Sequence, residues 1–341
     1  MVDISHHAER LTDPREDTYK EPTYDVAQLG HVEILSPDLQ ATADFLTRVY
    51  GLYTVQETAD SVYLRAWNDD VLTSLKVTSA AQPGPGHVAW RCTSPQALGR
   101  RVAALEAKGI QGQWIDGDVG HGRAYQYRGP GGHLQEIYFE TEKFVAPEGR
   151  KPYLPNQPQK YDPHGVAAAH LDHINLLVPD VAQASAFAQE SLGFKLRERL
   201  VPAGSDQEVG AWLSVMTKAH DLALTQEPYP TEGRLHHLAY AVESREDVLR
   251  AADIFMENGV PIDFGPAKHS RTQGFFLYVI EPGGNRIEVF SGGIHIFSPD
   301  WEPVTWDTET GGRSTAWGLA TPPSFKEYAT PPYVPAAAPV G

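Results

Sequence analysis

The chain has 341 residues, which is long enough for two domains of about 150 residues and additional terminal segments. Hydrophobic residues make up 41% and charged residues 21%, as in ordinary globular proteins, and no apolar run approaches the roughly 20 residues of a membrane-spanning helix. The formal net charge of −16 argues against nucleic acid or an anionic membrane as a partner, because both attract basic surfaces.

The N-terminal segment and the cysteine content both bear on the cellular compartment. Residues 1–20 are polar and acidic and contain no apolar stretch, so we expect no signal peptide. Cys92 is the only cysteine, which excludes an intrachain disulfide, and its apolar neighbours predict an inert buried thiol. Together these features favour a cytoplasmic protein.

The first half of the chain predicts two similar units of strands and a helix. Residues 30–35 alternate apolar and polar side chains, as in a strand, and Asp38 is a suitable N-cap for a helix that Gly51 ends. A second strand and helix are predicted at 87–92 and 94–108. Further strands are predicted near 61–67, 72–78, 124–128 and 134–139.

The second half repeats this order. A strand at 173–178 precedes a helix at 180–192, and a strand at 237–242 precedes a helix at 244–258. Further strands are predicted near 212–215, 222–225, 275–280 and 286–290. Four βαβββ-like units, paired two and two, predict an α+β fold of two tandem domains.

Composition predicts the boundaries of these domains. Residues 142–169 are rich in Pro, Tyr and Lys and are expected to form a linker, whereas 294–341 contain many prolines and aromatic residues and are expected to form a C-terminal arm. We expect the aromatic residues of the arm to cover the second domain or to form a subunit contact. The predicted segments are an extension at 1–29, domains at 30–141 and 170–293, the linker and the arm.

Three residues that can bind metals recur in the same order, at similar separations, in both halves. They are His31, His87 and Glu136 in the first half and His173, His237 and Glu288 in the second. Two imidazoles and one carboxylate form the facial triad that holds non-haem Fe(II) with open coordination positions. The repeated pattern therefore predicts a metal site more strongly than any single histidine does.

The chain resembles the type I extradiol ring-cleaving dioxygenases of the vicinal oxygen chelate superfamily, in particular the catechol 2,3-dioxygenase group. The resemblance extends roughly from His31 to Phe290. It is most specific between His269 and Glu288, which include Gly-Phe-Phe-Leu-Tyr and Pro-Gly-Gly-Asn-Arg-Ile-Glu. It implies the vicinal oxygen chelate, or glyoxalase-like, fold with one Fe(II), or less often Mn(II), in the second domain.

The resemblance also implies roles for individual residues. The metal ligands would be His173, His237 and Glu288, and the acid–base residues would be His220, His269 and Tyr278. His220 would act on the O2 side, and the other two would hydrogen-bond the catechol oxygens. The implied reaction opens the ring of a catechol beside the diol with O2 and gives a hydroxymuconic semialdehyde. The implied assembly is a homotetramer.

Two further expectations concern the pocket. Trp212 and Phe264 are candidate pocket residues, and no arginine cluster stands near the site residues in the sequence. We therefore expect a neutral catechol, or an alkyl- or chlorocatechol, as the substrate. Alternation along the strand is expected to turn His236 away from His237, toward the opposite face.

The first half is expected to lack a catalytic metal. Spacing places Asp70 where the second half has His220, and an ungapped match places Gln126 where it has Tyr278. The interval from His121 to Glu136 is also shorter than the matching interval in the second half. We therefore expect one iron per chain, with the first triad left as hydrogen-bonded polar residues.

Two other classes of function remain open from the residues. A glyoxalase-type isomerase would use the same scaffold, but such enzymes usually place metal ligands on both halves of a shared site. A non-catalytic small-molecule binding module would need no acid–base residues. The presence of His220, His269 and Tyr278 favours oxygenation over both, since the scaffold alone hosts several chemistries.

Overall fold

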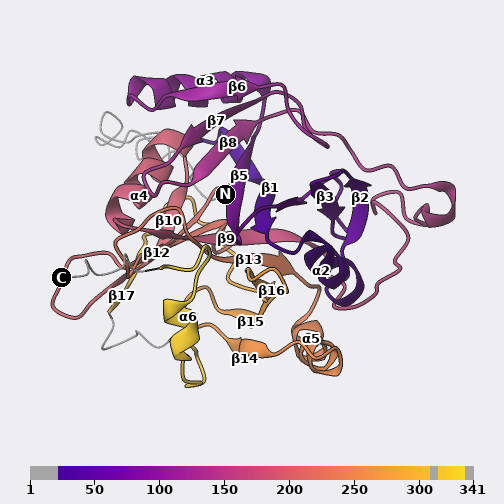
Figure 1. Ribbon diagram of the computed structural model, residues 1–341. Coiled ribbons are helices and arrows are strands. Elements are labelled where there is room, and N and C mark those ends of the chain that lie inside the picture. Colours follow the sequence, from indigo (N-terminus) through magenta and orange to yellow (C-terminus); the bar gives the residue numbers. More distant parts are fainter. Residues whose placement is uncertain (1–21, 308–313, 335–341) are drawn as a thin grey trace, which may run out of the picture.

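The computed structural model describes residues 22–307 and 314–334, and each half of the chain builds one mixed β-sheet (Figure 1). Within the described residues, no helix is long and apolar enough to cross a membrane. The N-terminal extension predicted at 1–29 and the arm predicted at 294–341 lie partly outside the described residues.

The first sheet has eight strands in the order β2-β3-β4-β1-β5-β8-β7-β6. Its elements are β1 (Val26–Ser36), α2 (Leu39–Asp44), η1 (Phe45–Val49), β2 (Tyr53–Glu57), β3 (Ser61–Arg65), β4 (Leu75–Ser79), β5 (Gly84–Cys92), α3 (Pro95–Ala107), β6 (Gly112–Ile115), β7 (Ala124–Arg128) and β8 (Leu134–Tyr138). The antiparallel pair of β1 and β5 lies at its centre. A short 3-10 helix, η2 (Glu148–Arg150), follows in the connecting segment.

The second sheet has nine strands in the order β14-β15-β16-β13-β9-β12-β11-β10-β17. Its elements are β9 (His170–Val178), α4 (Val181–Phe187), η3 (Ala188–Leu192), β10 (Lys195–Val201), β11 (Gly210–Ser214), β12 (Leu222–Gln226), β13 (Leu235–Ala241), α5 (Arg245–Glu257), β14 (Ile262–Lys268), β15 (Gly274–Ile280), β16 (Arg286–Gly292) and β17 (Val304–Asp307). Apart from β17, the order matches that of the first sheet, which confirms the predicted pairs of βαβββ units.

The sequence reading missed the strand that directly follows each helix. These are β2, β6, β10 and β14, which lie at or next to the edges of the two sheets. Strands at an edge are covered on fewer sides, so their side chains alternate less regularly between apolar and polar. In β6, for example, Gly112, Gln113 and Trp114 are all exposed.

All four helices of the repeated units begin at a side chain that caps the first turn. Asp38 and Asp180 accept hydrogen bonds from backbone N–H groups three residues ahead, and Ser94 and Ser244 do the same. The helices predicted at 38–50 and 180–192 are each an α-helix continued by a π-helix, namely η1 and η3. The π-helical turns have wider hydrogen-bond spacing, but both helices still end close to the predicted residues.

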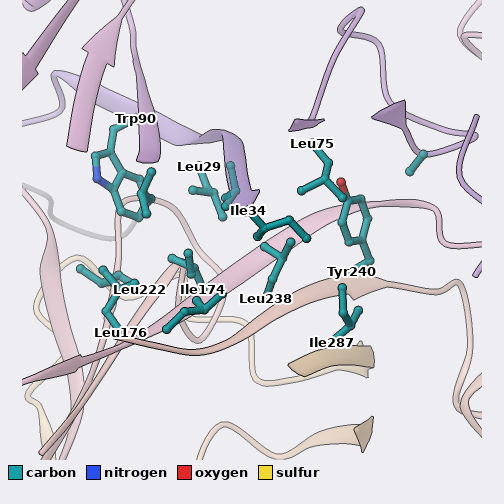
Figure 2. Packing of buried hydrophobic residues seen from close by; sticks show 14 of the residues in the cluster. Leu29, Ile34, Leu75, Trp90, Ile174, Leu176, Leu222, Leu238, Tyr240 and Ile287 are labelled. Atoms are coloured by element: carbon teal, nitrogen blue, oxygen red, sulfur yellow. The ribbon is translucent and has the colours of Figure 1, made fainter. Parts of the chain in front are cut away.

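The main hydrophobic core lies between the two sheets (Figure 2). Leu29, Ile34 and Trp90 of the first half lie opposite Ile174 and Leu238 of the second, and all five are at most 5% exposed. Burying a side chain of this size stabilises the fold by about 1.5–3 kcal/mol. Side chains alternate along a strand, so the opposite faces of these central strands are left for other residues.

The described part of the arm runs along the second sheet. β17 extends this sheet by pairing with β10, and Thr330 exchanges backbone hydrogen bonds with Leu235 of β13. Between them, α6 (Pro323–Glu327) lies beside β14 and β15 (Figure 1). The buried guanidinium of Arg286 donates to the carbonyls of Ser324 and Tyr328. These bonds hold the arm against the second sheet.

Candidate metal centre and active site

Three side chains from neighbouring strands converge on the face of the second sheet that points away from the core. His173 belongs to β9, His237 to β13 and Glu288 to β16. The His173 and His237 Nε2 atoms are 3.3 Å apart, and each lies 3.0–3.1 Å from Oε2 of Glu288. Ligands about 2.1 Å from one ion would be separated by about 3.0–3.4 Å, so the three atoms suit a single metal.

A second observation supports a cation at this place. Glu288 is fully buried, and within the described residues its Oε1 atom accepts no hydrogen bond. A buried carboxylate oxygen without a partner is costly unless a positive charge lies beside it. The donor set of two imidazoles and one carboxylate fits iron or manganese.

Asp172 fixes the orientation of His173. Its Oδ1 atom lies 2.7 Å from Nδ1 of His173, so the imidazole donates there and presents Nε2 to the site. Asp172 is held in turn by Lys218, which also pairs with Asp221 at 3.1 Å. Such outer hydrogen bonds set the tautomer and the direction of a metal-binding histidine.

His236 fixes the orientation of His237, and the prediction that it faces the opposite side is wrong. A register irregularity between Leu235 and His237 brings both rings to one side, with their Nδ1 atoms 2.7 Å apart. His236 donates from Nε2 to the carbonyl of Phe325 at 2.8 Å. Its Nδ1 must therefore accept from Nδ1 of His237, whose Nε2 is left with a free lone pair.

The electrostatics of the metal-free cluster show where a proton sits. Burial alone would lower the pKa of His173, but the carboxylates of Glu288 and Asp172 raise it to about 9. Burial lowers the pKa of His237 to about 4. Burial alone would raise the pKa of Glu288, but His173 and the other histidines hold it well below its usual range. A metal ion would replace the proton on His173.

The three predicted acid–base residues surround this cluster. His269 Nε2 lies 3.0 Å from the Tyr278 hydroxyl and 3.5 Å from Oε1 of Glu288. The His220 ring lies 4.0 Å from the His173 ring, on another side, and has no hydrogen-bond partner among the described residues. Burial lowers the pKa of His220 well below its usual range and raises the pKa of Tyr278, so both are neutral near pH 7.

A cavity of about 360 Å³ opens onto the cluster and is lined by all three of these residues. Trp212 also lines it, as expected. Phe264 does not: it packs behind Tyr278, with its ring nearly parallel at 6.2 Å, and is a core residue rather than a pocket residue. The arm contributes Thr321, Phe325 and Lys326 to the wall.

Arg271 also lines the cavity, which the sequence reading did not anticipate. Its guanidinium lies 5.0 Å from the centre of the Trp212 ring, and burial lowers its pKa. Arg271 is only two residues after His269, but it stands alone in the sequence and gives no cluster to recognise. Asp172 and His236 were likewise missed, although each directly precedes a ligand.

Two residues of the first half were predicted to match acid–base residues of the second, namely Gln126 with Tyr278 and Asp70 with His220. The ladders pair Gln126 with Glu136 as they pair Tyr278 with Glu288, which confirms that match. They pair Leu75 with Val32 as they pair Leu222 with Ile174, so Thr73 rather than Asp70 stands where the second half has His220. Asp70 is exposed and pairs with Lys143, and the spacing argument failed because the intervening turns differ in length.

Comparisons with known proteins agree with this geometry. The model of the Glyoxalase/Bleomycin resistance protein/Dioxygenase superfamily matches residues 28–137 and 170–289. The chain is 43% identical to a metapyrocatechase of Geobacillus stearothermophilus, over 92% of this chain and 96% of that protein. It is 36% identical to a manganese-dependent 2,3-dihydroxybiphenyl 1,2-dioxygenase of Geobacillus genomosp. 3, over 86% and 94%.

A solved structure shows the same similarity. The 2,3-dioxygenase LapB of Pseudomonas sp. KL28 superposes with a TM-score of 0.76 and is 32% identical. The superposition covers 84% of this chain and 98% of LapB.

Proposed function

Because this chain belongs to the Glyoxalase/Bleomycin resistance protein/Dioxygenase superfamily, we propose that it is an extradiol dioxygenase which opens a catechol-type ring with O2. The enzyme is an oxidoreductase that uses Fe(II), or Mn(II), and the reaction adds both atoms of O2 to one diol. The product is a hydroxymuconic semialdehyde, so no external reductant is needed. The observation that carries this proposal is the convergence of three metal-binding atoms beside a cavity lined by His220, His269 and Tyr278.

We assign the metal to His173, His237 and Glu288. Support comes from the 3.0–3.3 Å separations of their inner atoms and from the unpaired, buried oxygen of Glu288. When bound, the ion would bring the diol and O2 together on one centre. Asp172 and His236 hold the two imidazoles in the tautomers that a metal requires.

The acid–base roles follow from the positions of the side chains. The Tyr278 hydroxyl and His269 Nε2 form a connected pair, which can accept a proton from a diol hydroxyl and hold it. His220 lies on the other side of His173 and is neutral, so it can hydrogen-bond the oxygen reactant and transfer a proton there.

We also infer a homotetramer in the cytoplasm. The tetramer rests on the family resemblance, and the compartment rests on the single cysteine, Cys92, which is buried and unpaired. Sedimentation of the purified protein and fractionation of the source cells test these two statements separately.

The proposal is tested with the full chain loaded anaerobically with Fe(II) or Mn(II). Catechol added in air should give a yellow product, with one O2 consumed per catechol. The variant His237→Ala should show neither the product nor the oxygen uptake. Metal-loaded protein that consumes no O2 with any catechol, yet isomerises a glutathione hemithioacetal, would assign the scaffold to an isomerase instead.

A further inference from the structure

We propose that the first half of the chain holds a second divalent metal ion, at His31, His87 and Glu136, and that this ion is structural. The three side chains are 5%, 6% and 0% exposed and lie on β1, β5 and β8. Neither the fold class nor the proposed reaction requires a metal at this place.

The inner atoms of this first triad are spaced like those of the second. The His31 and His87 Nε2 atoms are 2.9 Å apart, and His31 Nε2 lies 3.2 Å from Oε1 of Glu136. His87 Nε2 lies 3.9 Å from the other oxygen of Glu136. Small side-chain shifts would bring all three to about 2.1 Å from one ion.

The hydrogen bonds around the triad direct lone pairs inward. His87 faces the carboxylate of Glu33 with Nδ1 at 2.9 Å, so Nδ1 carries the proton and Nε2 accepts. His121 donates from Nδ1 to the carbonyl of Gly122, which leaves its Nε2 lone pair 3.6 Å from Glu136. Nε2 of His121 and Oε1 of Glu136 are thus two acceptors that face each other. In a buried site such a pair requires a positive charge between them.

The carboxylate of Glu136 gives a second sign of a cation, independent of the spacing of the ligand atoms. Within the described residues, its Oε1 atom is buried and accepts no hydrogen bond, as is also true of Oε1 of Glu288. Gln126 donates to the other oxygen at 3.1 Å and leaves Oε1 unpaired. The same buried, unpaired oxygen therefore marks both triads.

The space that would receive a substrate is filled in the first half, which is why the ion is structural. The pair Glu33 and Lys76 takes the place of Asn175 and Ala223 in the ladder. The Lys76 ammonium reaches Asp118 at 2.7 Å and lies 3.5 Å from Glu33. Thr73 stands where the second half has His220, and Gln126 stands where it has Tyr278, so the first triad has no room for a diol and lacks two of the three acid–base groups.

The sequence predicted one iron per chain. That expectation treated the first triad as residues that satisfy one another by hydrogen bonds. The single proton between His31 and His87 leaves Glu136 Oε1 without a partner, so the triad does not satisfy itself.

Metal analysis of the full chain, purified with excess zinc and iron and then desalted, tests the proposal. We expect about two metal ions per chain in the wild type and about one in His237→Ala/Glu288→Ala. Adding His31→Ala and His87→Ala to that variant should remove the remaining ion. One ion in the wild type and none in His237→Ala/Glu288→Ala would overturn the proposal, whether or not the enzyme cleaves catechols.

A conservative variant covers the case in which the alanine variants fail to fold. Glu136→Gln keeps the shape of the side chain and removes its charge. In the His237→Ala/Glu288→Ala background, zinc should raise the melting temperature of the chain with Glu136 and leave that of Glu136→Gln unchanged. Equal effects of zinc on the two proteins would contradict the proposal.

A second inference rests on the proposed function and on a different observation. We infer that the preferred diol carries an anionic substituent, which Arg271 holds. The Nη1 atom of Arg271 is buried and has no hydrogen-bond partner among the described residues. The described residues that line the cavity include no aspartate or glutamate, and Lys326 adds a second cation at its wall. A buried cation without a partner is stabilised when a ligand brings the opposite charge.

The nearest carboxylate does not satisfy Arg271. Glu198 accepts from the backbone of Thr272 at 2.8 Å and from the indole of Trp306 at 2.5 Å. Glu198 attracts Arg271 electrostatically, but it accepts no hydrogen bond from Nη1, so this N–H group remains without a hydrogen-bond partner among the described residues. The inference departs from the expectation of a neutral catechol, which rested on the lack of an arginine cluster near the site residues in the sequence.

The test compares kcat/KM for 3,4-dihydroxyphenylacetate and 4-methylcatechol. The wild type should favour the acid, and Arg271→Met should lower that preference by about 10- to 100-fold, as for a lost hydrogen bond to a charged group. Arg245→Met, at an exposed site on α5, is the matched control and should keep the wild-type ratio. A wild type that favours methylcatechol, or a ratio unchanged in Arg271→Met, would overturn the inference, whereas no cleavage of either diol would contradict the proposed function.

Discussion

Replacing His133 by glutamine should remove part of the acid sensitivity of this fold. His133 is 3% exposed, just before β8, and donates from Nε2 to the carbonyl of Arg234 in the other half at 2.9 Å. Burial lowers its pKa to about 4. The ring therefore joins the two halves, and its burial opposes protonation although the hydrogen bond to Arg234 by itself favours the charged form.

The sign and size of the effect follow from linkage. In the unfolded chain the histidine titrates near pH 6.5, so the unfolded state binds a proton below that pH while the folded state does not until about pH 4. The stability is therefore fully present above about pH 6.5 and is lost as the pH falls. The loss from His133 is about 2 kcal/mol at pH 5 and about 3 kcal/mol at pH 4.

Urea unfolding of the chelator-treated protein at several pH values between 7 and 4 measures this. Other buried histidines also weaken the fold in acid, so the informative quantity is the difference between wild type and His133→Gln. That difference should change by about 3 kcal/mol over this range in favour of the variant. The exposed His164→Gln control should run parallel to the wild type. Parallel curves for His133→Gln would refute the reasoning.

The remaining predictions concern the second half and one contact that the first half makes with it. His237→Ala should lose the metal of that half and all ring cleavage, as seen by metal analysis and oxygen uptake; normal activity would sink the ligand assignment. His220→Phe should keep its metal but slow turnover by about 10²–10⁴-fold in single-turnover experiments, and loss of the metal instead would make His220 a ligand. Tyr50→Phe removes a 2.7 Å hydrogen bond to the carbonyl of Glu288 and should lower the free energy of unfolding by about 1–2 kcal/mol; an unchanged urea midpoint would contradict this. Truncation after Gly293 removes the carbonyl that orients His236, so it should lower the melting temperature and weaken metal binding, and unchanged values of both would count against the role of the arm.

The repeated pattern was enough to predict the fold because a strand with one buried face alternates regularly. Ile174 and Leu176 point to the core, so His173 must point to the other face, and the same holds for His31 between its neighbours. Ligands on central strands are thus visible in the sequence.

Features that depend on local irregularity or on distant segments were not visible. The register shift before His237 breaks the alternation of side chains and puts His236 on the ligand side. No residue type in the sequence predicts such a bulge. The pairing of Thr73 depends on turn lengths that spacing alone does not give. The missing hydrogen-bond partner of Arg271 Nη1 appears only when the surrounding side chains are packed around it.

The hydrogen bond between His236 and the carbonyl of Phe325 makes the metal centre depend on a segment that is synthesised late. The ligands all precede residue 289, but the carbonyl that fixes the His237 tautomer belongs to α6, near the C-terminal end. During synthesis the three ligands leave the ribosome before the group that completes their alignment. We therefore expect the metal to bind tightly only when nearly the whole polypeptide has been made, and chains that end before α6 to bind it more weakly.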